Sequence, residues 1–257
     1  MADIVYGFHP VREGLRGRRQ PLELFVIEGP VNERVQKLLD LAAERGIPVR
    51  RRRKADLDRL AGLPHHQGVV LSVEPFTFCD LDDVLKAWHA SGRPAFFLLL
   101  DGITDPHNFG AILRNADAAG CHGVIVPKDR SCPVSGVVDK TSAGAVEHLP
   151  ICQVTNLGRA IEQLKAANVW VYGLSGDAAG KPVYAEDLTG HVALVIGSEG
   201  EGLRQLTRQL CDGLLAIPMA GQVASLNAAS ASAVALFEVA RQRLGNAGSA
   251  AGREEPS

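Results

Sequence analysis

The hydrophobic pattern differs between the first 75 residues and the rest of the chain. Within this first part, apolar positions at helical spacing over 33–46 predict a helix that ends at Gly46, and apolar stretches over 22–29 and 68–73 predict strands. Shorter patterns of the same kinds predict a helical turn from Phe8, a strand over 47–51 and a helix over 55–63. We therefore expect residues 1–75 to fold as a small α/β domain.

Six uninterrupted apolar runs, mostly separated by helical patterns, follow in the second part. They cover residues 95–100, 123–127, 151–154, 169–175, 192–197 and 213–218. Strands that are apolar throughout and separated by helices are typical of a parallel sheet covered on both faces. The sequence thus predicts a second α/β domain over 95–245 that ends in a long helix over 226–244. Residues 76–94, bounded by prolines, are expected to form a linker with a connecting helix, and the polar residues 246–257 a disordered tail.

Composition excludes several classes of protein. The first residues include Asp3, Arg12 and Glu13 and lack the apolar run of a signal peptide. No stretch reaches the roughly 18 apolar residues that span a bilayer, so we expect a cytoplasmic protein without a membrane partner. The five cysteines never form a C-x-x-C pair, which favours free thiols over structural zinc or disulfides. His65 and His66 have no partner at ligand spacing, so we expect no metal and interpret both as surface residues.

The charge is unevenly distributed along the chain. Residues 1–75 contain 13 Lys and Arg against 10 Asp and Glu, a balance of +3, whereas the remainder has a balance of −5. Such an asymmetry favours contact between the first part and a polyanion. The densest basic run is Arg50, Arg51, Arg52, Arg53 and Lys54, and Arg16, Arg18 and Arg19 extend it. These residues are candidates for phosphate binding, with a merely solvated face as the alternative.

Three polar, glycine-containing segments follow predicted strands of the second domain: residues 101–120, 196–204 and 217–233. In parallel α/β sheets, ligands bind beyond the carboxyl ends of the strands, so three such segments together favour a shared site over ordinary turns. The chain lacks the G-x-G-x-x-G, G-x-x-x-x-G-K-[ST] and G-x-S-x-G patterns. Their absence argues against dinucleotide-binding, P-loop and serine-hydrolase chemistry.

The sequences of these segments are more specific than their positions. DPHNFGAILRNADAAG, VALVIGSEGEGLR and IPMAGQVASLNAASASAVALFE resemble, in order, the three motifs of the SpoU/TrmH family of RNA 2′-O-ribose methyltransferases, and they cover most of residues 96–244. The resemblance implies S-adenosyl-L-methionine as cofactor and a parallel-sheet domain with a deep trefoil knot. It also implies a homodimer, in which Ala228, Ala231, Ser232 and Ala235 would allow close packing of the last helix. One departure from many relatives is Asn115, where they carry Thr.

The first domain adds an RNA-binding function to this resemblance. YGFHPVREGL and HHQGVVLSV are similar to the small domain, related in fold to ribosomal protein L30e, that precedes the catalytic domain in family members acting on a guanosine of 23S ribosomal RNA. The implied partner is 23S rRNA or a precursor ribosomal particle. Two kinds of alternative stay open: an enzyme of the same family acting on transfer RNA or on an rRNA adenosine, and a non-catalytic RNA-binding assembly factor. The latter would be expected to have lost Arg114, Glu199 or Asn227, and all three are present.

The family resemblance also implies roles for individual residues. Catalytic roles fall on Asn108, Arg114, Glu199, Ser225 and Asn227, and cofactor binding on Leu174, Ser175, Gly197, Ile217, Met219 and Leu226. Because a guanidinium pKa exceeds about 12, we interpret Arg114 as a clamp on phosphate and on the developing alkoxide rather than as a base. Simpler interpretations are a surface Arg114, a helix-start carboxylate for Glu199 and an N-cap for Ser225. The simpler interpretation of the apolar residues of the cofactor-binding set, Ile217, Met219 and Leu226, is that they belong to the core.

Overall fold

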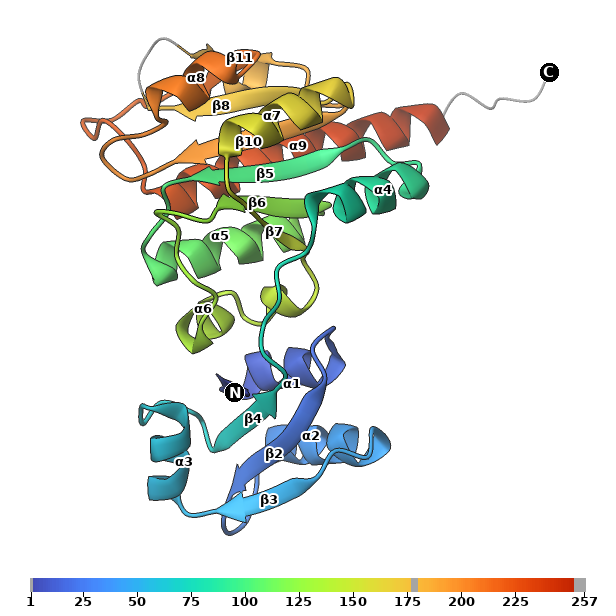
Figure 1. Ribbon diagram of the computed structural model, residues 1–257, viewed down its shortest axis with the longest axis vertical. Helices are drawn as coiled ribbons and strands as arrows, with labels where there is room; N and C mark the ends of the chain where they lie inside the picture. The colour runs from blue at the N-terminus through green and yellow to red at the C-terminus, as the bar shows by residue number, and fades with distance from the viewer. Residues whose placement is uncertain (1, 177–179, 252–257) are drawn as a thin grey trace, which may run out of the picture. The chain divides into compact units, whose positions relative to one another are not determined.

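The computed structural model describes residues 2–176 and 180–251 of the 257-residue chain (Figure 1). The chain divides into two compact units. Unit 1 comprises Met1–Thr77, Phe109–Arg114 and Pro133–His148, and unit 2 comprises Phe78–Asn108, Asn115–Cys132 and Leu149–Ser257. Helix α5 (Pro106–Ala118) therefore contributes its middle turns to unit 1 and its ends to unit 2.

Unit 1 contains a four-stranded sheet. Its order is β1 (Asp3–Tyr6), β4 (Val69–Val73), β2 (Pro21–Ile27) and β3 (Val49–Arg52), with β3 parallel to β2 and the other pairs antiparallel. The predicted strands and helices of residues 1–75 are all present, the helices being α1 (Phe8–Arg16), α2 (Glu33–Glu44) and α3 (Lys54–Ala61). The hydrophobic pattern did not indicate β1, a strand that starts with Asp3 and in which only Val5 and Tyr6 are buried. His66 is buried beside Asp58, so its interpretation as a surface residue was wrong.

Both faces of this sheet are covered. Alternate residues of a strand point to opposite faces. Leu71 accordingly joins the apolar cluster under α1 and α2, whereas its neighbour Val70 packs with Leu57 of α3. The short helices α6 (Gly136–Thr141) and η1 (Ala145–Glu147) also belong to unit 1, where α6 packs against β1 and η1 against α1.

Unit 2 contains a seven-stranded sheet in which every strand pairing is parallel, as predicted. Its order is β7 (Ile151–Val154), β6 (Gly123–Pro127), β5 (Phe96–Asp101), β10 (Val192–Gly197), β8 (Trp170–Ser175), β11 (Gly213–Ala216) and β9 (Lys181–Pro182). The six apolar runs correspond to all of these strands except β9, which has only two residues. Because the strands are parallel, the segments that follow β5, β8, β10 and β11 emerge at the same edge of the sheet.

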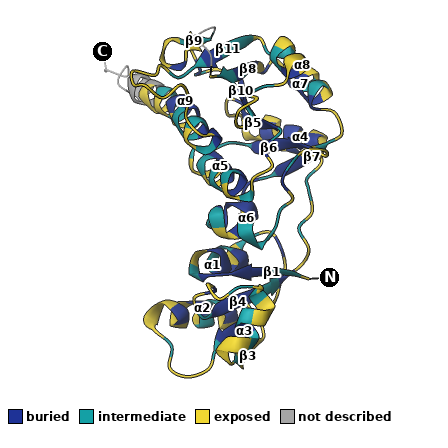
Figure 2. Cartoon of the chain, turned by 90° about the vertical axis from the view of Figure 1, so that its left-hand side faces the viewer, coloured by how far each residue is buried: buried dark blue, intermediate teal, exposed yellow. Residues whose placement is uncertain are grey.

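Helices cover both faces of the unit 2 sheet (Figure 2). Helices α4 (Leu81–Ser91) and α7 (Leu157–Ala166) pack with Phe97 and Leu99 on one face, and α8 (Gln205–Leu210) lies against α7. The other face carries α9 (Ala228–Ala251), whose Arg243 lies over the ring of Phe96; the short helix η2 (Val183–Ala185) contacts α9.

Helix α9 is longer than the predicted helix over 226–244. It includes the first six residues of the expected tail, and residues 252–257 lie outside the described residues. Ala228, Ser232 and Ala235 are buried within the chain, so the expectation that they form a packing face between two copies was wrong. Among the described helices, none is both long and apolar enough to cross a membrane.

Candidate active site

A cavity of about 350 Å³ lies at the carboxyl ends of β8, β10 and β11. Three segments form its wall: the end of β8 with Gly176, the end of β10 with the loop that follows it, and the stretch between β11 and α9 together with the first turn of that helix. All six residues expected to bind the cofactor line this cavity, namely Leu174, Ser175, Gly197, Ile217, Met219 and Leu226. The fold thus brings together side chains that are up to 52 positions apart in the sequence.

The wall combines accessible apolar side chains with accessible backbone. None of Leu174, Ile217, Met219 and Leu226 is buried, and Met219 and Leu226 are 38% and 39% exposed, so they are not core residues. Residues 217–227 form neither helix nor strand. Because each of their backbone N–H and C=O groups needs a hydrogen-bond partner, this segment can recognise the polar edge of a ligand.

Gly197, the last residue of β10, allows the chain to approach itself. A Cβ atom at this position would collide with the backbone of Gly202 and Leu203. Ser198 and Gly202 exchange backbone hydrogen bonds of 3.1 and 3.0 Å, which close a tight loop with Glu199 near its tip. Gly200 and Gly202 have φ of 83° and 67°, a region that favours glycine. Gly197 therefore determines the shape of this part of the cavity wall, because it lets the loop that follows β10 pack closely against the end of the strand.

Three of the five candidate catalytic residues meet beside the cavity. Asn108 Nδ2 donates to Glu199 Oε1 at 2.9 Å, and Asn227 Nδ2 lies 3.4 Å from Asn108 Oδ1. Glu199 Oε1 also accepts the backbone N–H of Ala228, the first residue of α9, at 3.4 Å. Glu199 does not begin the helix that follows it, since α8 starts at Gln205. Its carboxylate instead joins the first turn of α5 to the first turn of α9.

The helix caps explain how these side chains are held. Asp105 Oδ2 accepts the backbone N–H of Asn108 and caps α5, with Pro106 at the first helical position. Asn227 Oδ1 accepts the backbone N–H of Ser230 at 2.8 Å and caps α9. Ser225 is therefore not the cap, and it lies on the cavity wall. Asp105 was not among the residues singled out from the sequence, although Asp before Pro at a helix start is a recognisable capping signal.

Arg114 takes no part in the hydrogen bonds of this cluster. Its side chain is exposed and makes no hydrogen bond or ion pair with the residues that the structure describes. Asn115 rather than Arg114 shares the helix face of Asn108, because seven residues make about two turns. Asn115 Nδ2 donates to the carbonyl of Ala229 in α9 at 3.1 Å. Arg114 thus projects from the neighbouring exposed face of α5, where a polyanion can reach it.

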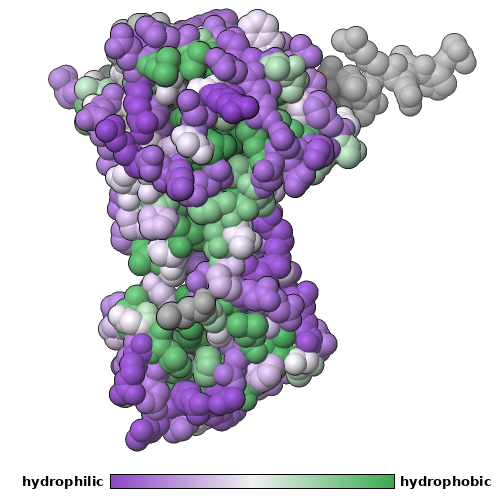
Figure 3. Space-filling model, viewed as in Figure 1, coloured by the Kyte–Doolittle hydropathy of each residue, from purple (hydrophilic) through white to green (hydrophobic). Residues whose placement is uncertain are grey.

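The basic run of unit 1 lies on an edge strand. Arg50, Arg51 and Arg52 belong to β3, which pairs with β2 at the edge of the described sheet, and Figure 3 shows many hydrophilic residues along this part of unit 1. Arg50 pairs with Glu23, Arg51 donates to the carbonyl of Gly29 at 2.7 Å, and Arg53 lies 3.5 Å from Asp56. The run is exposed except for the half-buried Arg52, and Arg16, Arg18 and Lys54 are exposed as well.

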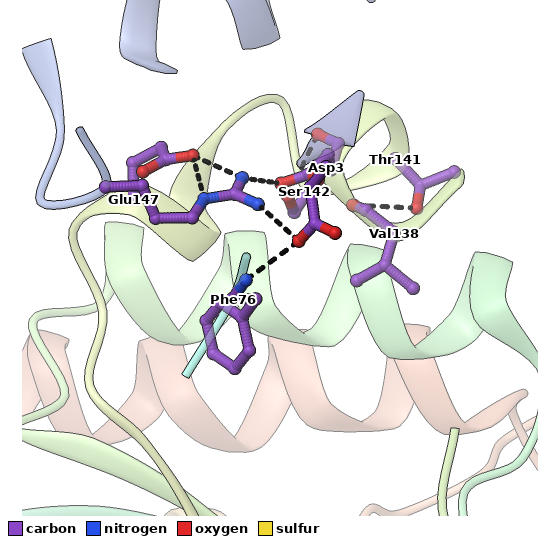
Figure 4. A network of polar contacts seen from close by, with 8 residues as sticks. Asp3, Phe76, Val138, Thr141, Ser142 and Glu147 are labelled. Atoms are coloured by element: carbon purple, nitrogen blue, oxygen red, sulfur yellow. Dashed lines mark hydrogen bonds and ion pairs between the residues drawn. The ribbon is translucent and has the colours of Figure 1, made fainter. Parts of the chain in front are cut away.

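Arg19 is the exception among the basic candidates. Its guanidinium is 8% exposed and is surrounded by three carboxylates (Figure 4). Glu147 Oε1 accepts from Nε at 2.8 Å, Asp139 Oδ1 accepts from Nη2 at 2.7 Å, and Asp3 lies at 3.4 Å. Burial and the neighbouring Glu147 raise the pKa of Asp139 to about 7, against the lowering effect of Arg19. This arrangement removes Arg19 from the residues that can reach an RNA phosphate.

Comparison with known proteins agrees with this geometry. Residues 95–237 match the SpoU rRNA Methylase family, and residues 4–79 match the domain described as RNA 2′-O ribose methyltransferase substrate binding. The chain belongs to the SpoU rRNA methylase family. The first of these matches includes every residue of the cavity wall and of the polar cluster beside it.

Relatives in the SpoU family match almost the whole chain. The 23S rRNA (guanosine-2′-O-)-methyltransferase RlmB of Vibrio vulnificus is 44% identical over 246 residues, which cover 94% of this chain and 98% of the relative. RlmB of Escherichia coli is 42% identical over 247 residues, 95% of this chain and 100% of the relative. Both units of the present chain are therefore found together in these relatives.

Solved structures of SpoU proteins have the same α/β architecture. AviRb from Streptomyces viridochromogenes, in complex with the cofactor AdoMet, has a TM-score of 0.77 at 28% identity, covering 94% of this chain and 90% of its own. An AdoMet-bound rRNA methyltransferase from Sinorhizobium meliloti has a TM-score of 0.76 at 26% identity, covering 93% and 87%.

Proposed function

We propose that this SpoU family member transfers a methyl group from S-adenosyl-L-methionine to the ribose 2′-hydroxyl of a guanosine in 23S ribosomal RNA, in the cytoplasm. The observation that carries the proposal is the cavity at the carboxyl edge of the sheet with the Asn108, Glu199 and Asn227 cluster beside it. The likeness to RlmB proteins over nearly their full length supports 23S rRNA as the substrate.

The cavity fits the proposed cofactor. Its volume lies within the range of about 300–1,000 Å³ that is usual for small-molecule sites. Met219 and Leu226 expose apolar surface that an adenine ring would cover, and the backbone of residues 217–227 offers donors and acceptors for its polar edge. Leu174, Ser175, Gly197 and Ile217 complete the proposed cofactor-binding set. When bound, the cofactor supplies an electrophilic methyl group on a sulfonium centre.

The polar cluster would align the RNA for the reaction. Glu199 fixes Asn108 and the start of α9, and Asn227 caps that helix, so the two helix starts are held together beside the cavity. Positioning of this kind accounts for a large part of the barrier reduction in group-transfer enzymes. Ser225, which lies on the cavity wall, would contact the reacting ribose.

Arg114 would act on the RNA rather than on the cofactor. A guanidinium remains protonated at any physiological pH, so it orients a backbone phosphate and stabilises the developing alkoxide. A phosphate oxygen or a water molecule would take the proton of the 2′-hydroxyl. The exposed position of Arg114 on α5 suits a group that works only when RNA is bound.

The remaining features of the proposal concern assembly and the RNA grip. Exposed Arg16, Arg18, Arg50, Arg51, Arg53 and Lys54, with the half-buried Arg52, would bind phosphates of the RNA. The protein would work as a homodimer through α9, where Phe237 and Leu244 are 48% and 75% exposed and lie two turns apart. The trefoil knot of the family is part of the same proposal.

A reconstituted reaction tests the proposed activity. Purified protein, S-adenosyl-L-methionine carrying a labelled methyl group and unmodified 23S rRNA should yield labelled 2′-O-methylguanosine. Transfer RNA in a parallel reaction should remain unlabelled. Label on transfer RNA alone would favour the alternative substrate, and cofactor binding without label on either RNA would contradict the proposal.

A further inference from the structure

Asp101 is a buried carboxylate next to the active site that the proposed chemistry does not use. It is the last residue of β5, and it lies opposite Gly197, the last residue of β10, in the parallel register of the two strands. The side chain is fully covered, at 0% exposure. A buried carboxylate is costly unless it is paired, so its partners indicate what it is for.

Among the residues that the structure describes, both polar contacts of Asp101 are with Arg204. Asp101 Oδ2 accepts the backbone N–H of Arg204 at 3.0 Å, and Asp101 Oδ1 lies 3.1 Å from Arg204 Nε. The carboxylate therefore accepts a hydrogen bond from the backbone of Arg204 through Oδ2, and its Oδ1 forms an ion pair with the Arg204 side chain without a hydrogen bond. The Arg204 side chain is 42% exposed, so the ion pair joins a buried carboxylate at the end of β5 to an arginine at the protein surface.

Arg204 ends the loop that carries Glu199. The Ser198 and Gly202 hydrogen bonds close the base of this loop, and the link to Asp101 fixes the point where it leaves toward α8. The strand end also lies against the loop itself: a Cβ on Gly102 would be 3.5 Å from Ser198 Cβ and 3.7 Å from Arg204 Nη2. The loop contains two glycines with positive φ, so it needs such external contacts to keep one conformation.

We infer that Asp101 is a positioning residue for methyl transfer, which acts through Arg204 by holding the 198–204 loop so that Glu199 meets Asn108 and the first turn of α9. The inference rests on the proposed function, because Glu199 matters to the reaction only there. A carboxylate with backbone and side-chain contacts to one arginine fixes both the position and the orientation of the loop end. Supporting groups of this kind hold reacting groups within the tolerance that the chemistry demands.

The test is a double-mutant cycle between Asp101→Asn and Glu199→Gln. Asparagine keeps the shape and an acceptor for the Arg204 N–H but removes the charge that faces the guanidinium. We expect Asp101→Asn to lower kcat about tenfold or more in the wild-type background and less than twofold in the Glu199→Gln background. Equal losses in both backgrounds, or no loss in the wild-type background, would overturn the inference.

A second readout does not depend on activity. Hydrogen exchange of the Ser198–Arg204 amides should become faster in Asp101→Asn and in Arg204→Ala, which keeps the backbone N–H and alters an exposed side chain. Unchanged exchange in Arg204→Ala would contradict the inference even if Asp101→Asn failed to fold. Faster exchange in an enzyme that methylates no RNA would sink the proposed function and leave the loop anchor standing.

Asp212→Asn is a matched control. Asp212 also pairs with a cation and a backbone N–H, those of Lys165 at 2.7 Å and Val171 at 2.8 Å, but it contacts the opposite end of β8. This substitution should leave kcat and the exchange of the 198–204 loop unchanged. An equal loss of kcat in Asp212→Asn would show that removing any paired acid near the sheet has the same effect, and the inference would fall.

Discussion

At the scale of single residues, Arg114 carries the most specific chemical claim. Arg114→Ala should lower methyl transfer by at least about 10²–10³-fold, the usual cost of removing one group that stabilises developing negative charge. Arg114→Lys should be nearly as inactive at every pH, because a point charge on a flexible stem cannot replace a bidentate clamp. Single-turnover methylation across pH measures both, with cofactor affinity by calorimetry expected to stay unchanged. A lysine variant that regains activity at high pH would contradict the clamp.

Gly197 gives a prediction about shape. Gly197→Ala places a Cβ against the backbone of Gly202, so the loop must shift and the cavity wall with it. We expect weaker binding of S-adenosyl-L-methionine and a loss of about 1–3 kcal/mol of stability, as for other overpacked sites. Calorimetry and thermal unfolding measure the two effects. Gly190→Ala is the control, since a Cβ there meets nothing within 4 Å; equal behaviour of the two variants would refute the assignment.

Asp139 gives a prediction about pH. Its pKa is raised from an ordinary value of 3.8 to about 7, mainly by burial. Between these two pH values, the carboxyl group is protonated in the folded protein and ionised in the unfolded chain. The contribution of Asp139 to the free energy of unfolding should therefore fall as pH rises from about 4 to 7 and level off above it. Urea unfolding measures this contribution. Between about pH 4 and 7, the free energy of unfolding should fall more steeply with pH in the wild type than in Asp139→Asn. Parallel pH profiles would show that Asp139 does not hold the proton.

At the scale of elements, the buried strands of unit 2 were predictable because each is an uninterrupted apolar run bounded by turns. Strand β9 was not, since two residues carry no periodicity, and neither was β1, in which only Val5 and Tyr6 are buried. The burial of Arg19 could not be predicted from the sequence either, because its partners Asp139 and Glu147 lie 120 and 128 positions away in the sequence. The small-residue face of α9 was assigned to a partner copy, whereas it packs within the chain.

Strand β3 and the residues after it give a prediction about RNA. Replacing Arg51, Arg52 and Arg53 with Ala should weaken RNA binding and reduce the slope of log affinity against log salt by about three, one for each lost phosphate contact. Cofactor affinity should not change. Lys86→Ala, an exposed cation of α4 paired with Asp83, should leave the slope as it is. An unaltered slope in the triple variant would show that the run is only a solvated surface.

At the scale of the whole molecule, three segments distant in sequence form one cavity because parallel strands deliver their carboxyl ends to one edge. The sequence motifs predicted that these three segments form one site, and all six proposed cofactor-binding residues lie on the cavity wall. Arg114 is not part of the hydrogen-bonded cluster around Glu199, because Asn115 rather than Arg114 lies on the helix face of Asn108. The knot and the homodimer that the family implies stay predictions.

The proposed function is most directly a statement about RNA in the cell: the protein methylates the ribose 2′-hydroxyl of a guanosine in 23S rRNA and does not methylate transfer RNA. Mapping 2′-O-methyl groups on ribosomal and transfer RNA from cells that contain the protein, lack it, or carry the Glu199→Gln variant tests this claim directly. We expect a 2′-O-methyl group on a 23S rRNA guanosine that is absent without the protein and strongly reduced with the variant, while the methylation of transfer RNA is unchanged. An identical map of 23S rRNA with and without the protein would contradict it.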